Sequence, residues 1–263
     1  MENLFHAVLG TGSCGNSYVI FDGKDSIIID QGYSFVQFKR KFLSLGIPIS
    51  SIKAIFMTHF HPDHCYGLKV TSNKLNVPLY IPKEAIEKEP VVFSKLNIKQ
   101  NKIISFDVSS TINIGDFKIT SFNTLHDSGG SVGYNLQNNG EVVTLITDTG
   151  DTTDEMVSFA SISDILFLES NYDEDMLLNG PYSYKLKKRV RGKWGHLSND
   201  QALELIKKSN FNGNYLYLIH LSDKNNDVEL VDNIFKSNTN IPNVITCQRG
   251  SVVNVMEKVK VEE

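Results

Sequence analysis

The chain has 263 residues, of which 41% are hydrophobic and 21% are charged, and its formal net charge is −4. This length supports one hydrophobic core and no linker-like stretch divides it, so we expect a single domain over residues 1–263. The sequence has no long apolar run, no basic leader and only three cysteines at unrelated spacings. These features favour a cytoplasmic protein without membrane contacts over a membrane protein or a disulfide-bonded scaffold. The net charge excludes nucleic-acid binding through overall positive charge, so a polyanion would have to meet a local patch.

The first part of the chain alternates predicted strands and helices. Apolar and β-branched runs predict strands at residues 4–9, 18–21, 26–29, 52–57 and 78–81, and helical spacing predicts helices at residues 35–45 and about 63–72. The glycine-rich segment 10–17 lacks the Gly-Lys-Ser/Thr sequence of a nucleotide-binding loop and precedes no helix. We therefore expect a tight hairpin connection there, with Ser13 and Asn16 lining a site.

From residue 102 onward the predicted strands are closely spaced, at residues 103–106, 111–114, 117–123, 131–136 and 141–146. This spacing predicts a mostly antiparallel second half, with a hairpin turn at residues 138–140. Later apolar runs predict strands at residues 165–168 and 215–219, and Ser198 with Gln201 predicts a capping box for a helix at residues 199–208. Two such halves facing each other predict a β-sandwich covered by helices.

The segment Thr58-His-Phe-His-Pro-Asp-His64 follows the strand at residues 52–57 and concentrates metal-binding side chains. His59 and His61 are two positions apart, so both imidazoles point to the same side of an extended chain. Asp63 and His64 follow a turn and project toward a second position, with Asp63 near the cap of the next helix. A lone buried histidine is usually hydrogen-bonded structure, but three histidines and an aspartate this close together favour a metal site. Cys65 is either a further ligand or a small buried side chain.

Three more metal-capable residues each follow a predicted strand, namely His126, Asp148 and His220. Each alone is as compatible with a satisfied polar residue as with a ligand, but their shared position at strand ends allows them to converge on one edge of a sandwich. Asp30 ends the strand at residues 26–29 in the same way. A carboxylate after so apolar a strand needs hydrogen bonds, so we expect Asp30 to support the metal loop from behind.

The pattern His-x-His-x-Asp-His at residues 59–64 resembles the signature of the metallo-β-lactamase superfamily. The resemblance implies an α/β (α+β) fold of four layers, αββα, and two divalent metal ions, zinc or manganese, that activate a water for hydrolysis. By this resemblance one ion is held by His59, His61 and His126, the second by Asp63, His64 and His220, and Asp148 bridges them, with Asp63 also counted as catalytic. The carboxylate at Asp148, where a zinc β-lactamase typically offers cysteine, argues against a true β-lactamase.

Glu169 follows the strand at residues 165–168, and His196 precedes the helix at residues 199–208. The arrangement resembles the tRNase Z group, in which a glutamate and a histidine at such places protonate the leaving oxygen of a phosphodiester. The chemistry holds on general grounds, because a carboxylate orients a neighbouring histidine and raises its pKa. The alternative is that Glu169 caps a strand end and His196 packs at the helix entry.

Six basic side chains lie within residues 185–193, and Trp194 follows them. Such a run is usually a solvated face, but both of its ends lead to the expected active site, so contact with a nucleic acid is equally compatible. We expect Lys188 and Arg189 to bind substrate, together with Asn226 in the segment after His220. Trp194 either stacks on a base or packs.

Together these segments look like the YycJ/WalJ branch of bacterial proteins over residues 5–235. That resemblance implies a 5′-to-3′ exonuclease acting on DNA, usually with manganese, and a link to mismatch repair. The chain lacks the inserted β-CASP domain of larger nucleases and the long arm with which tRNase Z grips tRNA. Two alternatives stay open: a cyclic-nucleotide phosphodiesterase of the same fold, and a non-phosphate hydrolase such as a lactonase or thioesterase. The expected partner is DNA or a nucleotide, and a homodimer is left open.

Overall fold

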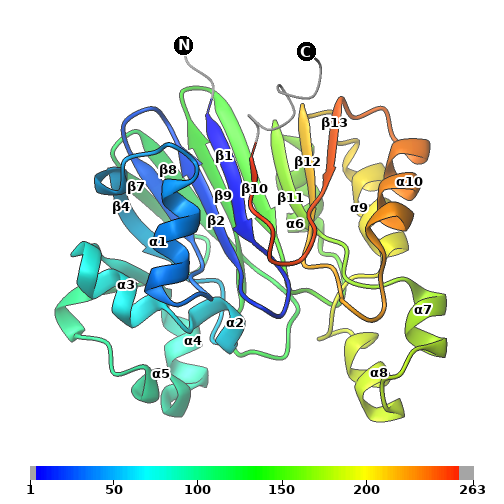
Figure 1. Ribbon diagram of the computed structural model, residues 1–263, viewed down its shortest axis with the longest axis horizontal. Coiled ribbons are helices and arrows are strands. Elements are labelled where there is room, and N and C mark those ends of the chain that lie inside the picture. The colour runs from blue at the N-terminus through cyan, green and yellow to red at the C-terminus, as the bar shows by residue number, and fades with distance from the viewer. Residues whose placement is uncertain (1–3, 255–263) are drawn as a thin grey trace.

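The structure is a computed structural model that describes residues 4–254. Two seven-stranded β-sheets face each other, and helices cover their outer faces (Figure 1). The four-layer α/β arrangement expected from the sequence is therefore confirmed. That residues 1–263 form one domain stays a prediction, because residues 1–3 and 255–263 lie outside the described part. Every helix between residues 4 and 254 is too short or too polar to cross a membrane.

The first sheet has the strand order β14-β1-β2-β3-β4-β5-β6. Its strands are β1 (Phe5–Gly10), β2 (Ser17–Phe21), β3 (Ser26–Ile29), β4 (Ile52–Phe56), β5 (Leu79–Pro82), β6 (Ile103–Phe106) and β14 (Val253–Asn254). Neighbours from β14 to β3 are antiparallel, and neighbours from β3 to β6 are parallel. The prediction that residues 103–106 belong to the antiparallel second half is wrong. Two helices separate β5 from β6, which leaves enough chain for a parallel crossover.

The second sheet has the strand order β13-β12-β11-β10-β9-β8-β7. Its strands are β7 (Thr111–Ile114), β8 (Phe117–Asn123), β9 (Val132–Asn138), β10 (Glu141–Ile146), β11 (Ile165–Glu169), β12 (Tyr215–Ile219) and β13 (Asn243–Thr246). Strands β7 to β10 pair antiparallel as expected, whereas β10 to β13 pair in parallel. Parallel strands bring their C-terminal ends to the same edge, and this property places the site residues together.

The core between the sheets consists of large apolar side chains from both of them. Tyr18 packs edge-on against Phe167 and Phe56 against Tyr134, with ring centroids 5.8 and 5.5 Å apart. The next residue in each strand points to the other face, so that Val19, for example, lies under the helices. Both faces of these strands are buried, which explains why they read as nearly continuous apolar runs.

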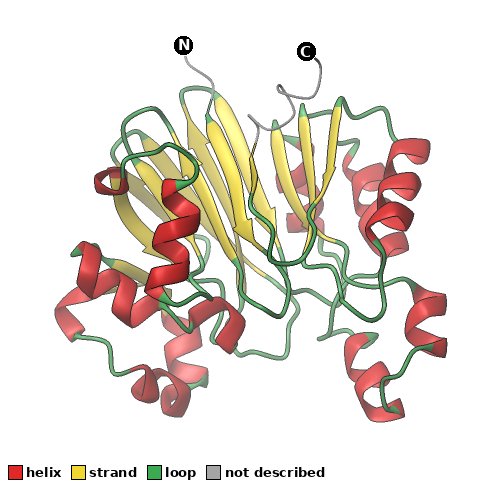
Figure 2. Ribbon diagram, in the orientation of Figure 1, coloured by secondary structure: helices red, strands yellow, loops and turns green. Residues whose placement is uncertain are grey.

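The helices form two covering layers and one separate pair, as Figure 2 shows. Over the first sheet lie α1 (Phe35–Leu43), α3 (Leu68–Leu75), α4 (Lys83–Lys88) and α5 (Pro90–Leu96), and over the second lie α6 (Asp154–Ser161), α9 (Asn199–Ser209) and α10 (Val228–Asn238). Single 3-10 turns occupy Ile49–Ser51 and Gln100–Lys102. The pair α7 (Glu174–Asn179) and α8 (Tyr184–Val190) projects beyond the sheets at the lower right of Figure 1 and packs through its own small cluster of Tyr172, Leu177 and Val190.

The helix expected over about residues 63–72 is two helices, α2 (Pro62–Cys65) and α3, and the expectation of one helix is therefore wrong. The cause is Gly67 between them, where a Cβ would lie 1.9 Å from the backbone oxygen of Tyr33. Only glycine permits this close approach, and it breaks the helix. Asp63, expected near the cap, lies in the first turn of α2.

His6 of β1 is a buried titratable group that ties the two sheets together. Its Nδ1 lies 2.8 Å from the hydroxyl of Tyr217 on β12, and burial lowers the pKa of His6 to about 4. The pKa of His6 is lower in the folded chain than in the unfolded chain. The stability that the buried, neutral His6 contributes is therefore fully present above about pH 6.5 and is lost as the pH falls toward 4.

We expect the free energy of unfolding to fall by about 2 kcal/mol between pH 7 and pH 5 on account of His6. In this interval His6 is protonated in the unfolded chain but stays neutral in the folded one. Urea unfolding of the native chain and of His6→Asn, both in chelator, measures this difference. Asparagine keeps a polar atom near the position of Nδ1 but does not titrate, so the variant should lose about 2 kcal/mol less over the same interval. Equal pH dependence of the two proteins would contradict the assignment.

Candidate metal centre and active site

The residues expected to form the site lie at one edge of the sandwich. Strands β3, β4, β8, β10, β11 and β12 all end at this edge, and the segments after them bring the site residues together (Figure 1). Those residues are Asp30, the segment at residues 58–64, His126, Asp148, Glu169 and His220. The expected convergence at strand ends is thus what the sheet topology produces.

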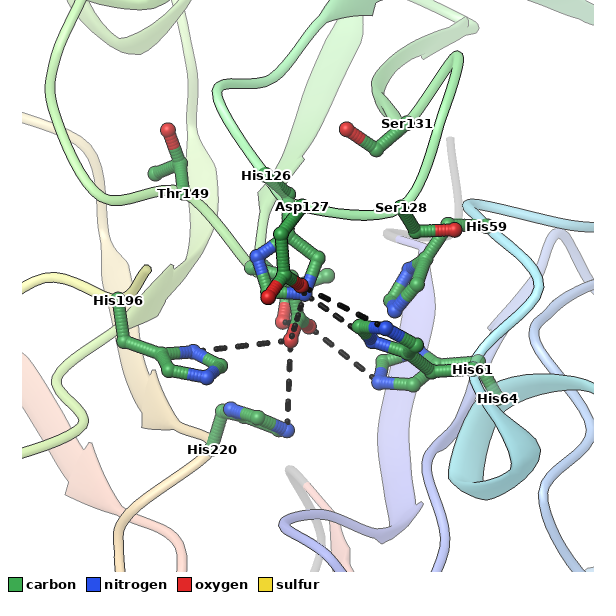
Figure 3. Close-up of polar contacts among 12 residues, drawn as sticks. His59, His61, His64, His126, Asp127, Ser128, Ser131, Thr149, His196 and His220 are labelled. Atoms are coloured by element: carbon green, nitrogen blue, oxygen red, sulfur yellow. Dashed lines mark hydrogen bonds and ion pairs between the residues drawn. The ribbon is translucent and has the colours of Figure 1, made fainter. Parts of the chain in front are cut away.

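Two sets of three donor atoms face a common space. The donor atoms of His59, His61 and His126 lie within 4.8 Å of one another, and so do those of Asp63, His64 and His220. Figure 3 shows His59, His61 and His64 pointing into this space from one side and His220 from the other, with His126 between them. These triplets match the two ligand sets that the superfamily resemblance implied. Donor atoms are equally close together in two overlapping groups, His59 with His64 and Asp148, and Asp148 with Glu169, His196 and His220, so the division into two sets stays a prediction.

Asp148 lies between the two sets. Its Oδ2 is 3.3 Å from Nε2 of His64, and its Oδ1 is 3.5 Å from Nε2 of His126 and 3.7 Å from Nε2 of His220. The backbone φ is +53° at Asp148, +58° at His220 and +60° at Asp30, so all three adopt the left-handed conformation at a strand end. Residues other than glycine rarely do so, and such strain is concentrated at functional sites.

Most of the ring nitrogens that face away from this space have a partner. Nδ1 of His59 contacts the Thr58 hydroxyl at 2.9 Å, and Nδ1 of His126 contacts the carbonyl oxygen of Gly195 at 2.9 Å. Nδ1 of His220 lies 3.0 Å from Glu169. Contacts of this kind fix the ring orientation and leave Nε2 free for a metal ion.

Two buried ring nitrogens in the site lack a hydrogen-bond partner within residues 4–254, as expected for ligands of a divalent metal ion. Nε2 of His59 and Nε2 of His220 are buried without a hydrogen-bond partner among the described residues. A buried polar atom without a partner is costly, and a metal ion would satisfy both. Burial holds the pKa of His59 well below its usual value and lowers that of His126 to about 4, so both rings keep the lone pair that a metal needs.

The charges of the second set also call for a cation. Burial alone would lower the pKa of His64, but the carboxylates of Asp148 and Asp30 outweigh it and raise the pKa to about 9. Burial would raise the pKa of Asp63, yet the nearby imidazoles of His220, 3.7 Å away, and of His64 lower it to about 2. The buried carboxylates are thus stabilised by positive charge, which bound protons or metal ions can supply.

Asp30 stands directly behind this set. Its Oδ1 accepts from the Thr58 N–H and its Oδ2 from the Thr58 hydroxyl, each at 2.8 Å, and Oδ2 lies 2.7 Å from Nδ1 of His64. Burial raises the pKa of Asp30, and the His64 contact opposes that rise. The Asp30 side chain therefore orients both the backbone of the motif and the ring of His64. It lies behind the metal loop, where the sequence analysis expected it.

Glu169 is a fully buried carboxylate that serves two histidines. Its Oε1 lies 2.7 Å from Nδ1 of His196 and 3.0 Å from Nδ1 of His220. Its Oε2 accepts from the N–H groups of Thr149 and Leu197, at 3.0 and 3.3 Å. Burial alone would raise the pKa of Glu169, but the neighbouring histidines, His196 foremost, hold it below its usual value. The carboxylate thus holds His220 and His196 side by side, with their ring centroids 5.3 Å apart.

The backbone around His196 is tied to α8. The His196 N–H donates to the carbonyl oxygen of Val190 at 2.9 Å, and a Cβ at Gly195 would lie 2.1 Å from the same oxygen. The expected capping box of Ser198 and Gln201 is confirmed at the start of α9. His196 is therefore held between the end of one helix and the beginning of the next.

Five of the site residues line an open cavity of about 570 Å³, namely His61, Asp63, Asp148, His196 and His220. Among the expected substrate-binding residues, Ser13 and Arg189 lie in its wall. The Asn16 amide instead contacts Asp63 Oδ2 at 3.3 Å and His64 Nε2 at 2.9 Å, so it belongs to the metal set's surroundings.

The other two expected substrate-binding residues lie elsewhere. Asn226 is buried, and its amide donates to Ser170 O and Asn199 Oδ1, both at 2.9 Å, which gives it a structural position outside the lining of this cavity. Lys188 lines a separate cavity on the other face of α8.

Two charged residues beside the site, Asp127 and Arg249, were not identified from the sequence. Asp127 forms a two-point ion pair with Arg189 and lies 3.5 Å from Nε2 of His61. Its position directly after His126 was the available signal. Arg249, near the end of the described chain, lines the cavity and pairs with Asp223 at 3.2 Å, and no local motif points to it.

Two open alternatives concern Cys65 and Trp194. The Cys65 thiol is buried and contacts the carbonyl oxygen of Phe60 at 3.3 Å, so the small-buried-residue interpretation fits it. Trp194 is 54% exposed, and the Lys193 ammonium lies 5.8 Å from its ring centroid. Its ring is accessible rather than packed in the core.

The fold and this paired donor set define a metal-dependent hydrolase of the αββα class. The family described as the Beta-lactamase superfamily domain matches residues 25–221, and the chain belongs to this family. It is 32% identical over 230 residues to exodeoxyribonuclease YycJ of Bacillus anthracis, covering 86% of each chain. It is 31% identical over 229 residues to exodeoxyribonuclease WalJ of Streptococcus pneumoniae, covering 86% of this chain and 84% of that one. The metallo-β-lactamase fold protein YhfI of Bacillus subtilis superposes with a TM-score of 0.73 at 19% identity, over 96% of this chain and all of that one.

Proposed function

We propose that the chain is a nuclease that hydrolyses DNA phosphodiesters from a 5′ end, with two divalent ions, zinc or manganese, in the site described above. The observation that carries the proposal is the Glu169–His196 pair, whose Oε1 and Nδ1 lie 2.7 Å apart directly beside the second donor set, with His196 in the cavity wall. The relatives with about 31% identity over most of the chain, both named exodeoxyribonucleases, support the choice of DNA.

The pair fits the departure of a poor leaving group. The Glu169 carboxylate accepts a hydrogen bond from the Nδ1–H group of His196. This contact orients the ring so that the other nitrogen, Nε2, faces the cavity. A proton at Nε2 can pass to the oxygen that leaves when a phosphodiester is cut, because sugar oxygens are strongly basic. A lactone or thioester needs this assistance less, which favours a phosphate substrate.

The donor set supports a site for two ions. Imidazole nitrogens and carboxylate oxygens suit zinc and manganese, and the assigned ligands include no thiolate. An ion bound there supplies Lewis acidity and positive charge beside the scissile phosphate. The chain's own part is to orient the ligands through Asp30, Thr58 and Glu169, as the contacts above describe.

The cavity wall carries the charge needed for a phosphate chain. Arg189, Lys224 and Arg249 line it, although Arg189 is paired with Asp127 and Arg249 with Asp223. A phosphodiester entering the cavity would compete for these guanidinium groups. A nuclease of this kind acts where the chromosome lies, which agrees with the expected cytoplasmic location.

The test is hydrolysis of duplex DNA in manganese, with Asp63→Ala as the blank. A 5′-labelled strand should release its label as mononucleotide at once, whereas a 3′-labelled strand should give a ladder of shortening products. Both signals should be absent in the blank. Turnover of 3′,5′-cyclic nucleotides without action on DNA would replace the proposal with a small-molecule phosphodiesterase.

A further inference from the structure

The outer face of α8 bears a second cavity, of about 540 Å³, that the proposed function does not use. Its lining residues are Leu178, Tyr184, Lys187, Lys188, Arg191 and Gly192. The opposite face of the same helix contributes Leu186, Arg189 and Val190 to the catalytic cavity. The two sets alternate at spacings of three and four, as expected for two faces of one helix. The helix α8, at the lower right of Figure 1, therefore lies between the two cavities.

The chemistry of this second cavity is aromatic and cationic. Tyr184 is 83% exposed, so its ring is presented to solvent, and Leu178 beside it is 46% exposed. Within residues 4–254, the ammonium of Lys188 has no ion-pair or hydrogen-bond partner. By contrast, Lys187 donates to the carbonyl oxygen of Leu178 at 2.7 Å and Arg191 pairs with Glu174.

We propose that this second cavity binds one unpaired nucleotide of a single DNA strand. The base stacks on the Tyr184 ring against Leu178, and the adjoining phosphate contacts Lys188. An exposed aromatic ring beside a free ammonium is the arrangement that binds single strands without reading their sequence. A base inside a duplex is already stacked and cannot offer its face to Tyr184, so the ligand is single-stranded.

The inference rests on the proposed nuclease function and extends it to a site outside the catalytic cavity. A helix with its side chains is about 10–12 Å thick, so one strand of a few nucleotides can reach from the second cavity to the metal centre. The chain has a negative net charge, and its overall electrostatic field therefore repels a polyanion. Binding of DNA then depends on local groups of basic residues such as those of the second cavity. The strand would thus be held at two places, on either side of α8.

The experiment measures binding of a fluorescent phosphorothioate oligothymidylate to the metal-loaded protein by anisotropy. Tyr184→Ala should weaken binding roughly 5- to 100-fold, the range of one base–aromatic stack, and Tyr184→Phe should retain it because the ring is kept. Lys188→Ala should lower the slope of log affinity against log salt by about 0.7, the value for one phosphate contact on a single strand. The matched control is Lys39→Ala, an exposed lysine on α1 at the other side of the molecule, which should change neither quantity.

Unchanged binding in Tyr184→Ala, or equal loss in Tyr184→Ala and Tyr184→Phe, would overturn the second site. Hydrolysis of bis(p-nitrophenyl) phosphate, which is too small to span both cavities, reports whether the catalytic cavity survives. If Tyr184→Ala disturbs that reaction, the salt slope of Lys188→Ala decides instead. If the native protein cleaves no DNA, the proposed function is wrong. If it cleaves DNA and the variants bind the oligonucleotide normally, only the inference of a second site is wrong.

Discussion

Replacing Asp148 with alanine should remove bound metal and lower kcat for any phosphodiester by roughly 10³-fold or more. The carboxylate faces both donor sets, with its two oxygens 3.3 Å from His64 and 3.5 Å from His126. Charge stabilisation by a metal ion contributes several kcal/mol to a transition state, and each 1.36 kcal/mol corresponds to a factor of ten in rate. A side chain that joins both sets should therefore affect both ions at once.

The measurement combines metal analysis of dialysed protein with turnover of bis(p-nitrophenyl) phosphate. The native chain should retain two equivalents of zinc or manganese and Asp148→Ala at most one. Asp151→Asn is a matched control, because Asp151 is an exposed carboxylate in the same loop and its change should leave metal content and turnover as they were. Two retained equivalents and normal turnover in Asp148→Ala would exclude a bridging role.

Replacing His196 with alanine should lower DNA hydrolysis by roughly 10²–10⁴-fold, the usual contribution of a general acid. The same variant should have little effect on bis(p-nitrophenyl) phosphate, whose leaving group needs no proton. The contrast between the substrates separates proton donation from a structural role, because a disturbed fold would slow both reactions. Stopped assays on both substrates with one preparation of enzyme measure it.

Glu169→Gln should behave differently from His196→Ala. Because Oε1 of Glu169 contacts both His196 and His220, its loss should reduce metal affinity as well, by about 10–100-fold as for other groups that orient metal ligands. Both substrates should then be turned over more slowly at limiting metal. If His196→Ala slows the two substrates equally, His196 is a structural residue and the packing alternative holds.

The residues expected to bind metal could be identified from the sequence because each belongs to a dense motif or follows an apolar strand. Parallel strands carry such ends to one edge, so His126, Asp148 and His220 meet although each is at least 22 positions from the next. The motif's local spacing predicted the ligand types, and the topology supplied the convergence.

Contacts made by exposed and distant residues could not be predicted in the same way. The Asp127–Arg189 pair joins residues 62 positions apart, and neither side chain belongs to a periodic pattern. The break at Gly67 depends on the backbone of Tyr33, which approaches from another part of the fold. Asn226 lies in a polar segment that suggests ligand binding, but its amide completes buried hydrogen bonds instead.

The backbone hydrogen bond between His196 and Val190 connects α8 directly to the site. The last turn of α8 ends at Val190, whose carbonyl oxygen accepts from the His196 N–H, while the carbonyl oxygen of Gly195 contacts His126. Under the proposed function, a bound strand that shifts α8 would therefore also shift His196 and His126 through these two contacts.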